Sequence, residues 1–99
     1  MIQPISFTSD YSVQLKTKYS KKKPSKKQTE KQINFLKFQQ CCEALINGID
    51  GVMFSSENFS DNKECKNITT LHVPNASDDV VESYLLYNNI KFKKKHVEN

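Results

Sequence analysis

Residues 67–95, NITTLHVPNASDDVVESYLLYNNIKFKKK, carry the strongest fold signal in this chain of 99 residues. The β-branched run 67–73 predicts a strand, and Pro74 ends it because proline restricts the preceding backbone and donates no hydrogen bond. Ser77 is then a candidate N-cap. The two acids at 78–79 fall in a first helical turn, where the helix dipole stabilises a carboxylate by about 0.3–1 kcal/mol. The segment therefore predicts a strand and then a helix.

The same segment also predicts the end of that helix and a further strand after it. Asn88–Asn89 favour a helix end because asparagine tolerates the left-handed backbone conformation. From there apolar and lysine side chains alternate, which is typical of a half-buried strand. Ile90 and Phe92 form its apolar side. The opposite side carries three lysines, Lys91, Lys93 and Lys95.

A second alternating strand is predicted near the start of the chain, over 11–19. Its apolar face carries Tyr11, Val13, Leu15, Thr17 and Tyr19. Its polar face carries Ser12, Gln14, Lys16 and Lys18. Upstream, Ile5 and Phe7 also alternate before a turn signal at Ser9–Asp10. A short extra strand within Ile2–Thr8, restricted to a sheet edge by Pro4, could therefore form a hairpin with 11–19.

Between these segments the sequence predicts a long helix and one more strand. Residues 20–28 form a lysine-rich connection, and two overlapping capping-box patterns come next, Ser25 with Gln28 and Thr29 with Gln32. The helix has apolar residues over more than half of its circumference, and Gly48 is its candidate C-cap. Residues 51–57 predict a strand, and the polar stretch 58–66 predicts a loop.

The predicted order is strand, helix, strand, strand, helix, strand, with a candidate extra strand at the front. This is the split βαβ, or ferredoxin-like, α+β arrangement. Its two right-handed crossovers place both helices on one face of a four-stranded antiparallel sheet and make the first and last strands neighbours. One domain is expected over 1–99, with a frayed tail at 96–99. The arrangement serves many functions and specifies none of them.

The charge of the chain is uneven. All 15 basic residues are lysine, and with 11 acids they leave a net charge of +4. Nine lysines lie in residues 1–40 and four in 91–99, whereas the middle of the chain is acidic. Because arginine is absent, bidentate recognition of phosphate or guanine by a guanidinium group is excluded.

The lysines of the first and last strands form a candidate anion-binding surface. If Leu15 and Phe92 face the helices, these lysines project together from the open face of the sheet. Like charges across strands are destabilising by about 0.2–1 kcal/mol per pair, and a bound polyanion such as nucleic acid would relieve this repulsion. The lysine-rich connection could extend the surface. The candidate residues are Lys16, Lys18, Lys21, Lys22, Lys23, Lys26, Lys27, Lys91, Lys93 and Lys95.

Two alternatives stand beside this hypothesis. Abundant lysine is also typical of AT-rich genomes, and lysines at strand edges protect sheets from aggregation. Residues 67–73 lack the stacking aromatics of RNA-binding sheets, so contact with the nucleic-acid backbone is favoured over reading of bases.

The second alternative is an interaction domain that forms a homodimer or binds an acidic protein. Candidates for its apolar contacts are Met53, Phe59 and Ile68.

The sequence argues against an enzyme, a resident metal and a cofactor. Cys41 and Cys42 are adjacent on an apolar helix, so they are interpreted as reduced core thiols rather than as nucleophiles or metal ligands. Cys65, His72 and His96 show no catalytic or metal-binding spacing. The two glycines of the chain cannot form a phosphate-binding loop.

No stretch is apolar enough to cross a bilayer, and residues 1–10 lack the order of a signal peptide. We therefore expect a cytoplasmic protein without a membrane partner.

Overall fold

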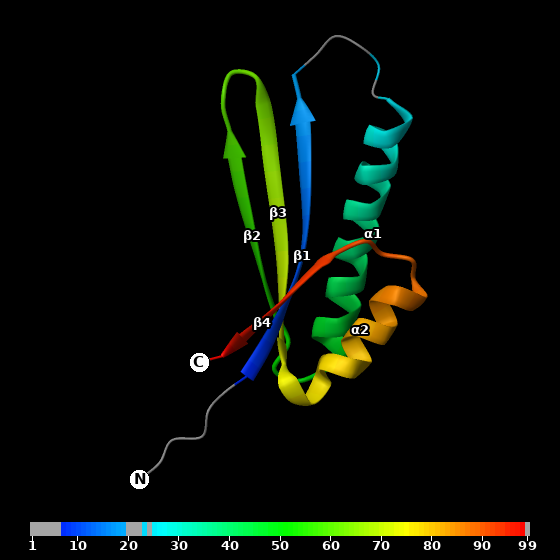
Figure 1. The fold of residues 1–99 in the computed structure, drawn as a ribbon, viewed down its shortest axis with the longest axis vertical. Coiled ribbons are helices and arrows are strands. Elements are labelled where there is room, and N and C mark those ends of the chain that lie inside the picture. The colour runs from blue at the N-terminus through cyan, green and yellow to red at the C-terminus, as the bar shows by residue number, and fades with distance from the viewer. Residues whose placement is uncertain (1–6, 20–22, 24, 99) are drawn as a thin grey trace.

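The computed structural model describes residues 7–19, 23 and 25–98. Its elements, labelled in Figure 1, are β1 (Phe7–Lys18), α1 (Lys26–Gly48), β2 (Met53–Ser60), β3 (Glu64–Pro74), the short 3-10 helix η1 (Asn75–Ser77), α2 (Asp78–Tyr87) and β4 (Lys93–Glu98). The four strands form one antiparallel sheet in the order β2-β3-β1-β4, and the two helices lie on one side of it. This is the predicted ferredoxin-like α+β arrangement, and the first and last strands are neighbours as expected.

β1 is a single continuous strand. Ser9 and Asp10, expected to form a turn, lie inside it and pair with β3 on one side and β4 on the other. The predicted hairpin at Ser9–Asp10 is therefore wrong, because pairing on both sides overrides the local turn propensity. Ser9 is fully buried there. The remainder of the candidate extra strand, residues 2–6, lies outside the described residues.

The N-cap of α1 is the residue that the sequence predicts. The Ser25 side chain accepts a hydrogen bond from the Gln28 backbone N–H at 3.1 Å, as the first capping-box pattern predicts. The helix starts at Lys26, so Lys26 and Lys27 belong to its first turn and not to the connection expected over 20–28. At the other end the predicted C-cap is wrong by one residue, because Gly48 is still helical and Ile49 is the C-cap. Ile49 donates its backbone N–H to the Leu45 carbonyl.

The β2–β3 hairpin is longer than the sequence indicates. Most of residues 58–66, expected to be a loop, belong to β2 and β3, and only 61–63 form the turn. Asp61 closes this turn, because its carboxylate accepts the backbone N–H groups of Lys63 at 2.7 Å and Glu64 at 2.8 Å. The extended strands escaped prediction because polar side chains occupy both faces of this part of the hairpin.

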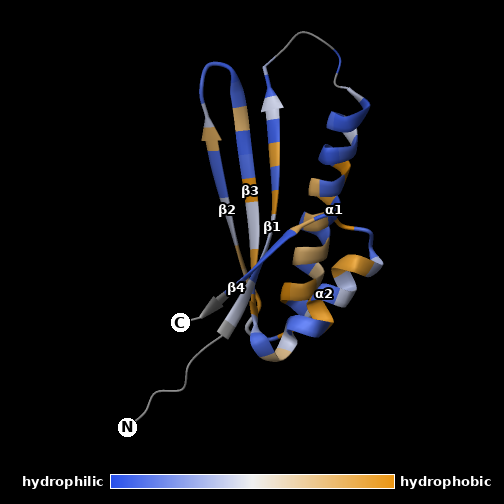
Figure 2. Ribbon diagram, viewed as in Figure 1, coloured by the Kyte–Doolittle hydropathy of each residue, from blue (hydrophilic) through white to orange (hydrophobic). Residues whose placement is uncertain are grey.

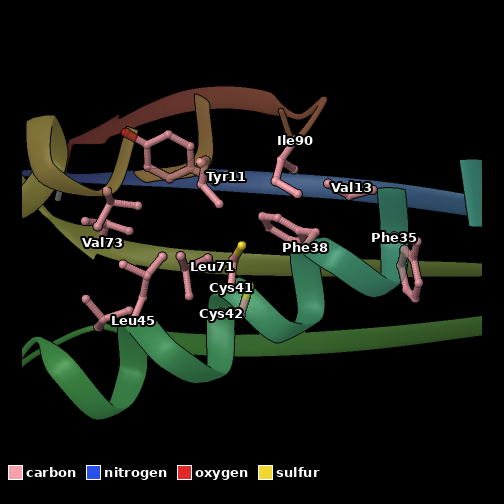
Figure 3. Close-up of a cluster of buried hydrophobic side chains, with 13 residues drawn as sticks. Tyr11, Val13, Phe35, Phe38, Cys41, Cys42, Leu45, Leu71, Val73 and Ile90 are labelled. Atoms are coloured by element: carbon pink, nitrogen blue, oxygen red, sulfur yellow. The ribbon is translucent and has the colours of Figure 1, made fainter. Parts of the chain in front are cut away.

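The core lies between the sheet and the helices (Figure 3). Tyr11 and Leu71, on neighbouring strands, are fully buried, as is Phe38 of α1. The other buried apolar side chains are Val13, Phe35, Cys41, Cys42, Leu45, Val52, Val73, Val81, Leu85 and Ile90. Figure 2 shows hydrophobic residues on the sides of α1 and α2 that face this layer. The predicted alternation is thus confirmed for the inward side of β1, except that Tyr19 lies beyond the end of the strand and is 60% exposed.

α2 agrees closely with the sequence prediction, but the last strand, predicted from Ile90, begins only at Lys93. Asp78 and Asp79 occupy the first turn of α2. Asn89 adopts the left-handed conformation with φ 59° just beyond the helix, where the sequence predicts a C-terminal cap. Ile90 is buried, and β4 then extends to Glu98 and pairs with β1, so most of the expected tail 96–99 is strand. Within the described part of the chain, no helix is long and apolar enough to cross a membrane.

Candidate polyanion-binding site

The sheet register separates the candidate lysines into two groups. β4 pairs with β1 only as far as Ser12, which lies opposite Lys93, and Asp10 lies opposite Lys95. Lys16 and Lys18 lie further along β1, beyond the last residue that pairs with β4. The lysines of β1 and β4 are therefore on neighbouring strands, as the fold requires, but they do not face one another.

The like-charge pair forms instead between β1 and β3. Lys16 lies directly opposite Lys66, a residue that the sequence places in the acidic middle of the chain. Lys18 lies opposite Glu64 in the same ladder. Lys66 could not be assigned to this site from sequence, because residues 58–66 looked like a loop with no defined strand partner.

Two hydrogen bonds bring further lysines to the same end of the molecule. The Tyr19 backbone N–H donates to the Lys63 carbonyl at 2.9 Å, which fastens the end of β1 to the β2–β3 turn. The Gln28 side-chain amide donates to the Lys16 carbonyl at 2.7 Å, which fastens the start of α1 to β1. We call the resulting cluster the basic tip: Lys16, Lys18, Lys23, Lys26, Lys27, Lys63 and Lys66.

The basic tip occupies the upper end of the molecule in Figure 1, where β1 ends, the β2–β3 hairpin turns and α1 begins. Figure 2 shows the start of α1 and the hairpin turn as hydrophilic. Two of the candidate lysines, Lys21 and Lys22, lie outside the described residues. Lys91, Lys93 and Lys95 lie elsewhere. The Asn34 side-chain amide holds the backbone of Lys91, because it donates to the Lys91 carbonyl at 2.9 Å and accepts the Lys91 N–H at 2.8 Å.

Carboxylates neutralise the basic tip only in part. Three acids lie close in the fold or sequence, Glu30, Asp61 and Glu64, against seven lysines. Hydrogen bonds from the backbone N–H groups of Glu64 and Lys63 lower the pKa of Asp61, so this carboxylate stays charged but is held by the turn. Among the described residues, every ion pair involves either Lys94 or His72 and none involves a tip lysine. The first turn of α1 contains lysines and no acid, so the positive end of its dipole adds to the local field.

One lysine of β4 has a structural role instead. Lys94 faces the helices, and its ammonium donates to Asp78 at 3.0 Å and to Glu82 at 2.8 Å. The buried Tyr11 hydroxyl donates to the same Asp78 carboxylate. The alternation of the sequence places Lys94 on the same side as Ile90 and Phe92. An inward-facing lysine needs an acidic partner, so this position could have predicted the ion pair.

This cluster shifts the pKa values of its members. The pKa of Lys94 is raised by its hydrogen bonds to Glu82 and Asp78. Burial raises the pKa of Tyr11, and the hydrogen bond to Asp78 raises it further. For Asp78, burial acts to raise the pKa, but the hydrogen bonds from Tyr11, Lys94 and Ser9 outweigh it and the pKa is lowered. The cluster therefore joins α2 to β1 and β4 in its charged, hydrogen-bonded form.

A serine, a histidine and an aspartate also form a chain of contacts across the open face. His72 Nδ1 lies 2.8 Å from a carboxylate oxygen of Asp10, and His72 Nε2 lies 3.1 Å from the Ser55 hydroxyl. This set could not be found from the sequence, because its members lie on three different strands and meet only in the correct register.

The order of atoms in this chain resembles that of a Ser-His-Asp hydrolase, but its surroundings do not support catalysis. Backbone N–H groups of a sheet lie in its plane, so they do not point at an oxyanion above Ser55. A cavity of about 410 Å³ lies on the other face between α1 and β2, lined in part by Cys42, Ile46 and Phe54. The three polar side chains therefore act as a hydrogen-bonded tie across β2, β3 and β1.

The cysteines are poorly suited to nucleophilic chemistry. All three are free. Burial raises the pKa of Cys41, and it raises the pKa of Cys42 to about 12, so both thiols stay protonated at neutral pH. Cys65 is half-buried, with its sulfur 3.6 Å from the Asn58 side-chain oxygen. Within the described residues, no group of three or more His, Cys, Asp or Glu side chains is arranged to hold a metal ion.

Comparison with known proteins adds two remote structural neighbours. No protein family and no curated protein matches the sequence. The designed protein Ferredog-Diesel is similar over 91% of this chain and 83% of its own, with 10% identity and a TM-score of 0.46. A hydantoinase/carbamoylase family amidase from Burkholderia ambifaria is similar over 96% of this chain but only 27% of its own, with 11% identity and a TM-score of 0.42. The fold is therefore defined by its own strand order and register.

Proposed function

We propose that this chain is a small non-catalytic binding module whose basic tip holds the phosphate backbone of a nucleic acid. The observation that carries the proposal is the pairing of Lys16 with Lys66, directly opposite each other and without a carboxylate partner among the described residues. Such a pair destabilises the free protein by about 0.2–1 kcal/mol, and an anion between the two ammonium groups would reverse that contribution.

The start of α1 supports the same proposal. Lys26 and Lys27 stand in its first turn, where the helix dipole disfavours positive charge. The cost falls when an anion approaches, because backbone N–H groups and lysine side chains then point toward a negative charge. Lysines from three separate segments thus lie at the same end of the molecule. These segments are the end of β1, the β2–β3 turn and the start of α1.

The chemistry of the tip also indicates how the ligand is bound. Lysine offers a mobile point charge, whereas recognition of a base edge or a single phosphate in fixed geometry generally uses the arginine fork. With lysines alone, binding should depend on the number of phosphates contacted and little on sequence. A continuous phosphate backbone therefore fits better than a small phosphorylated metabolite.

The test is a fluorescence anisotropy titration with labelled DNA and RNA over a range of salt concentrations. Binding should be measurable at about 50 mM salt and weaken steeply as salt rises. The double variant Lys16→Gln/Lys66→Gln should reduce the slope of log K against log salt by about two, since two phosphate contacts are lost. The matched control is Lys93→Gln/Lys95→Gln, which removes the same charge from β4 and should leave more of the binding intact.

Three outcomes overturn the proposal. Undetectable binding to every nucleic acid at about 50 mM salt would exclude phosphate contacts of the expected strength. An equal loss in the two double variants would point to net charge and not to the tip. Retention of full affinity by Lys16→Gln/Lys66→Gln would remove the Lys16–Lys66 pair from the interaction.

A further inference from the structure

The two edges of the sheet differ sharply in chemistry. β4 forms one edge with the sequence KKKHVE, in which three successive lysines repel another strand. β2 forms the other edge with the sequence MFSSENFS, which contains no lysine and no proline. All eight of its residues are exposed. Its single charged residue is Glu57, so β2 has little of the protection that usually keeps an edge strand from pairing.

Large apolar side chains are exposed on both faces of β2. Met53 is 66% exposed and Phe59 is 54% exposed on the open face of the sheet. Phe54, on the helix face, is 55% exposed and lines the cavity between β2 and α1. Met53 and Phe59 lie at opposite ends of the strand, so within one molecule they cannot cover each other.

We propose that a second copy of this chain pairs antiparallel with β2 about a twofold axis at Ser56. The two sheets then form one continuous sheet with the helices of both copies on the same face. Side chains directly opposite each other must point to the same face, so residue 53 pairs with residue 59 of the second copy, 54 with 58 and 55 with 57. The remaining edges are both β4, and their lysines stop further growth of the sheet.

This register fits the side chains of β2 on its open face. Met53 of each copy lies beside Phe59 of the other copy. The dimer therefore contains two such contacts, and each exposed apolar side chain has an apolar partner. Ser55 lies beside Glu57 of the other copy, which keeps the two carboxylates apart. Moving the axis to Glu57 would set the two Glu57 side chains directly opposite each other, and moving it to Ser55 would set Met53 opposite Glu57. Both shifts leave Met53 without an apolar partner, so the strand sequence favours the axis at Ser56.

Charge also matches at both ends of the paired strands. In the antiparallel arrangement the β2–β3 turn of one copy, with Lys63, approaches the start of β2 in the other copy. Asp50 precedes β2 there and is exposed. Each end of the interface therefore brings Lys63 of one copy near Asp50 of the other, while the basic tips of the two copies point in opposite directions. The interface shares Lys63 with the basic tip but does not use the Lys16–Lys66 pair. The tests below are made without nucleic acid, so their outcome does not depend on nucleic-acid binding.

Disulfide trapping tests the dimer and its register together. Ser56→Cys in a Cys65→Ser background should give a dimer on mild oxidation, because directly opposite Cα atoms in an antiparallel pair are close enough for a disulfide. Mass spectrometry should map the bond to residue 56 of both chains. Glu57→Cys and Gln14→Cys in the same background are the controls, the first for a shifted axis and the second for random collision between exposed strand residues outside β2.

Light scattering over a hundredfold concentration range provides the second measurement. The wild-type chain should shift from monomer to dimer, and Ser56→Lys, which sets two lysines opposite each other, should weaken the dimer by about tenfold or more. Gln14→Lys carries the same charge change on β1 and should dimerise like wild type. Circular dichroism should show that both variants keep the fold.

The proposal is overturned if the wild-type chain stays monomeric at every concentration, or if Ser56→Cys cross-links no better than Gln14→Cys. It is also overturned if Glu57→Cys cross-links faster than Ser56→Cys, since the axis would then lie elsewhere. A dimer of unchanged strength in Ser56→Lys would place the contact on another surface.

Discussion

Lys16 in β1 and Lys66 in β3 lie directly opposite each other on the face of the sheet that no helix covers. Antiparallel partners of this kind have Cβ atoms about 4.5–5.5 Å apart, close enough for two ammonium groups to repel. The sheet tolerates this pair although an acid at either position would stabilise it. In the proposed function this pair therefore lowers the stability of the free protein and favours the binding of an anion.

Replacing one member of the pair by an acid should stabilise the protein and weaken its binding. Lys66→Glu turns a repulsive cross-strand pair into an attractive one, so the free energy of unfolding should rise by about 0.2–1 kcal/mol at low salt. Urea denaturation measures this change, and the same preparation should bind nucleic acid less tightly. Lys93→Glu, placed opposite Ser12, is the control. A destabilised Lys66→Glu variant would mean that the two lysines do not repel in the folded protein.

The Asp78 cluster predicts loss of stability at both extremes of pH. The pKa of Asp78 is lowered, so its contribution is present above its usual pKa of 3.8 and is lost as the pH falls through the folded value. The pKa values of Tyr11 and Lys94 are raised, so their contributions are present below the usual values of 10.0 and 10.5 and are lost as the pH rises beyond them. The cluster should therefore be most stabilising between these limits.

Asp78→Asn tests the acid side of this window. At about pH 7 the variant should be less stable by about 1–2 kcal/mol, because the hydrogen bonds from Lys94 and Tyr11 lose their charged acceptor. As the pH falls through the lowered pKa of Asp78 the two proteins should converge, since the wild-type carboxylate is then protonated as well. Denaturation curves at several pH values measure the difference. A constant difference at every pH would contradict the lowered pKa of Asp78.

The Ser55–His72–Asp10 chain should give no hydrolase activity. Its geometry allows proton transfer from the serine hydroxyl, but the flat sheet face provides no backbone donors for the oxyanion. Hydrolysis of p-nitrophenyl acetate by the wild-type chain should therefore equal that of Ser55→Ala, and a fluorophosphonate probe should label neither. Activity that disappears in both Ser55→Ala and His72→Ala would contradict this prediction and identify an esterase.

Thiol reactivity should differ among the three cysteines. Cys41 and Cys42 are buried with raised pKa values, so their thiols should react with an aromatic disulfide reagent only after unfolding. Cys65 is half-buried and should react first. Stopped reactions analysed by mass spectrometry measure the order, with Cys65→Ser as control. Rapid modification of Cys42 in the native protein would show that α1 opens easily.

Several features of the fold depend only on short stretches of sequence. The Ser25 cap, the buried cysteine pair and the left-handed Asn89 were all predictable, because capping, helical periodicity and asparagine backbone preferences act over a few residues. The order of strands and helices came from the same local signals, since the right-handed crossover rule leaves one arrangement for this order.

The composition of the candidate site was only partly predictable. The sequence showed that Lys16, Lys26 and Lys27 are available for anion binding, but it indicated no strand for Lys66 and placed Lys93 and Lys95 beside Lys16. The first error arose because polar side chains on both faces made residues 58–66 look like a loop. The second arose because a strand pattern reveals which side chains share a face but contains no information on how far two strands slide along each other.

The sequence by itself determined the α+β class, the N-cap of α1, the apolar faces and the lack of an arginine fork for anions. Only the tertiary structure decided that Lys16 faces Lys66, that Lys94 turns inward to Asp78 and that Ser55, His72 and Asp10 meet. The physical reason is the range of the interactions. Helix and strand propensities depend on neighbours along the chain, whereas register is set by simultaneous packing of residues tens of positions apart.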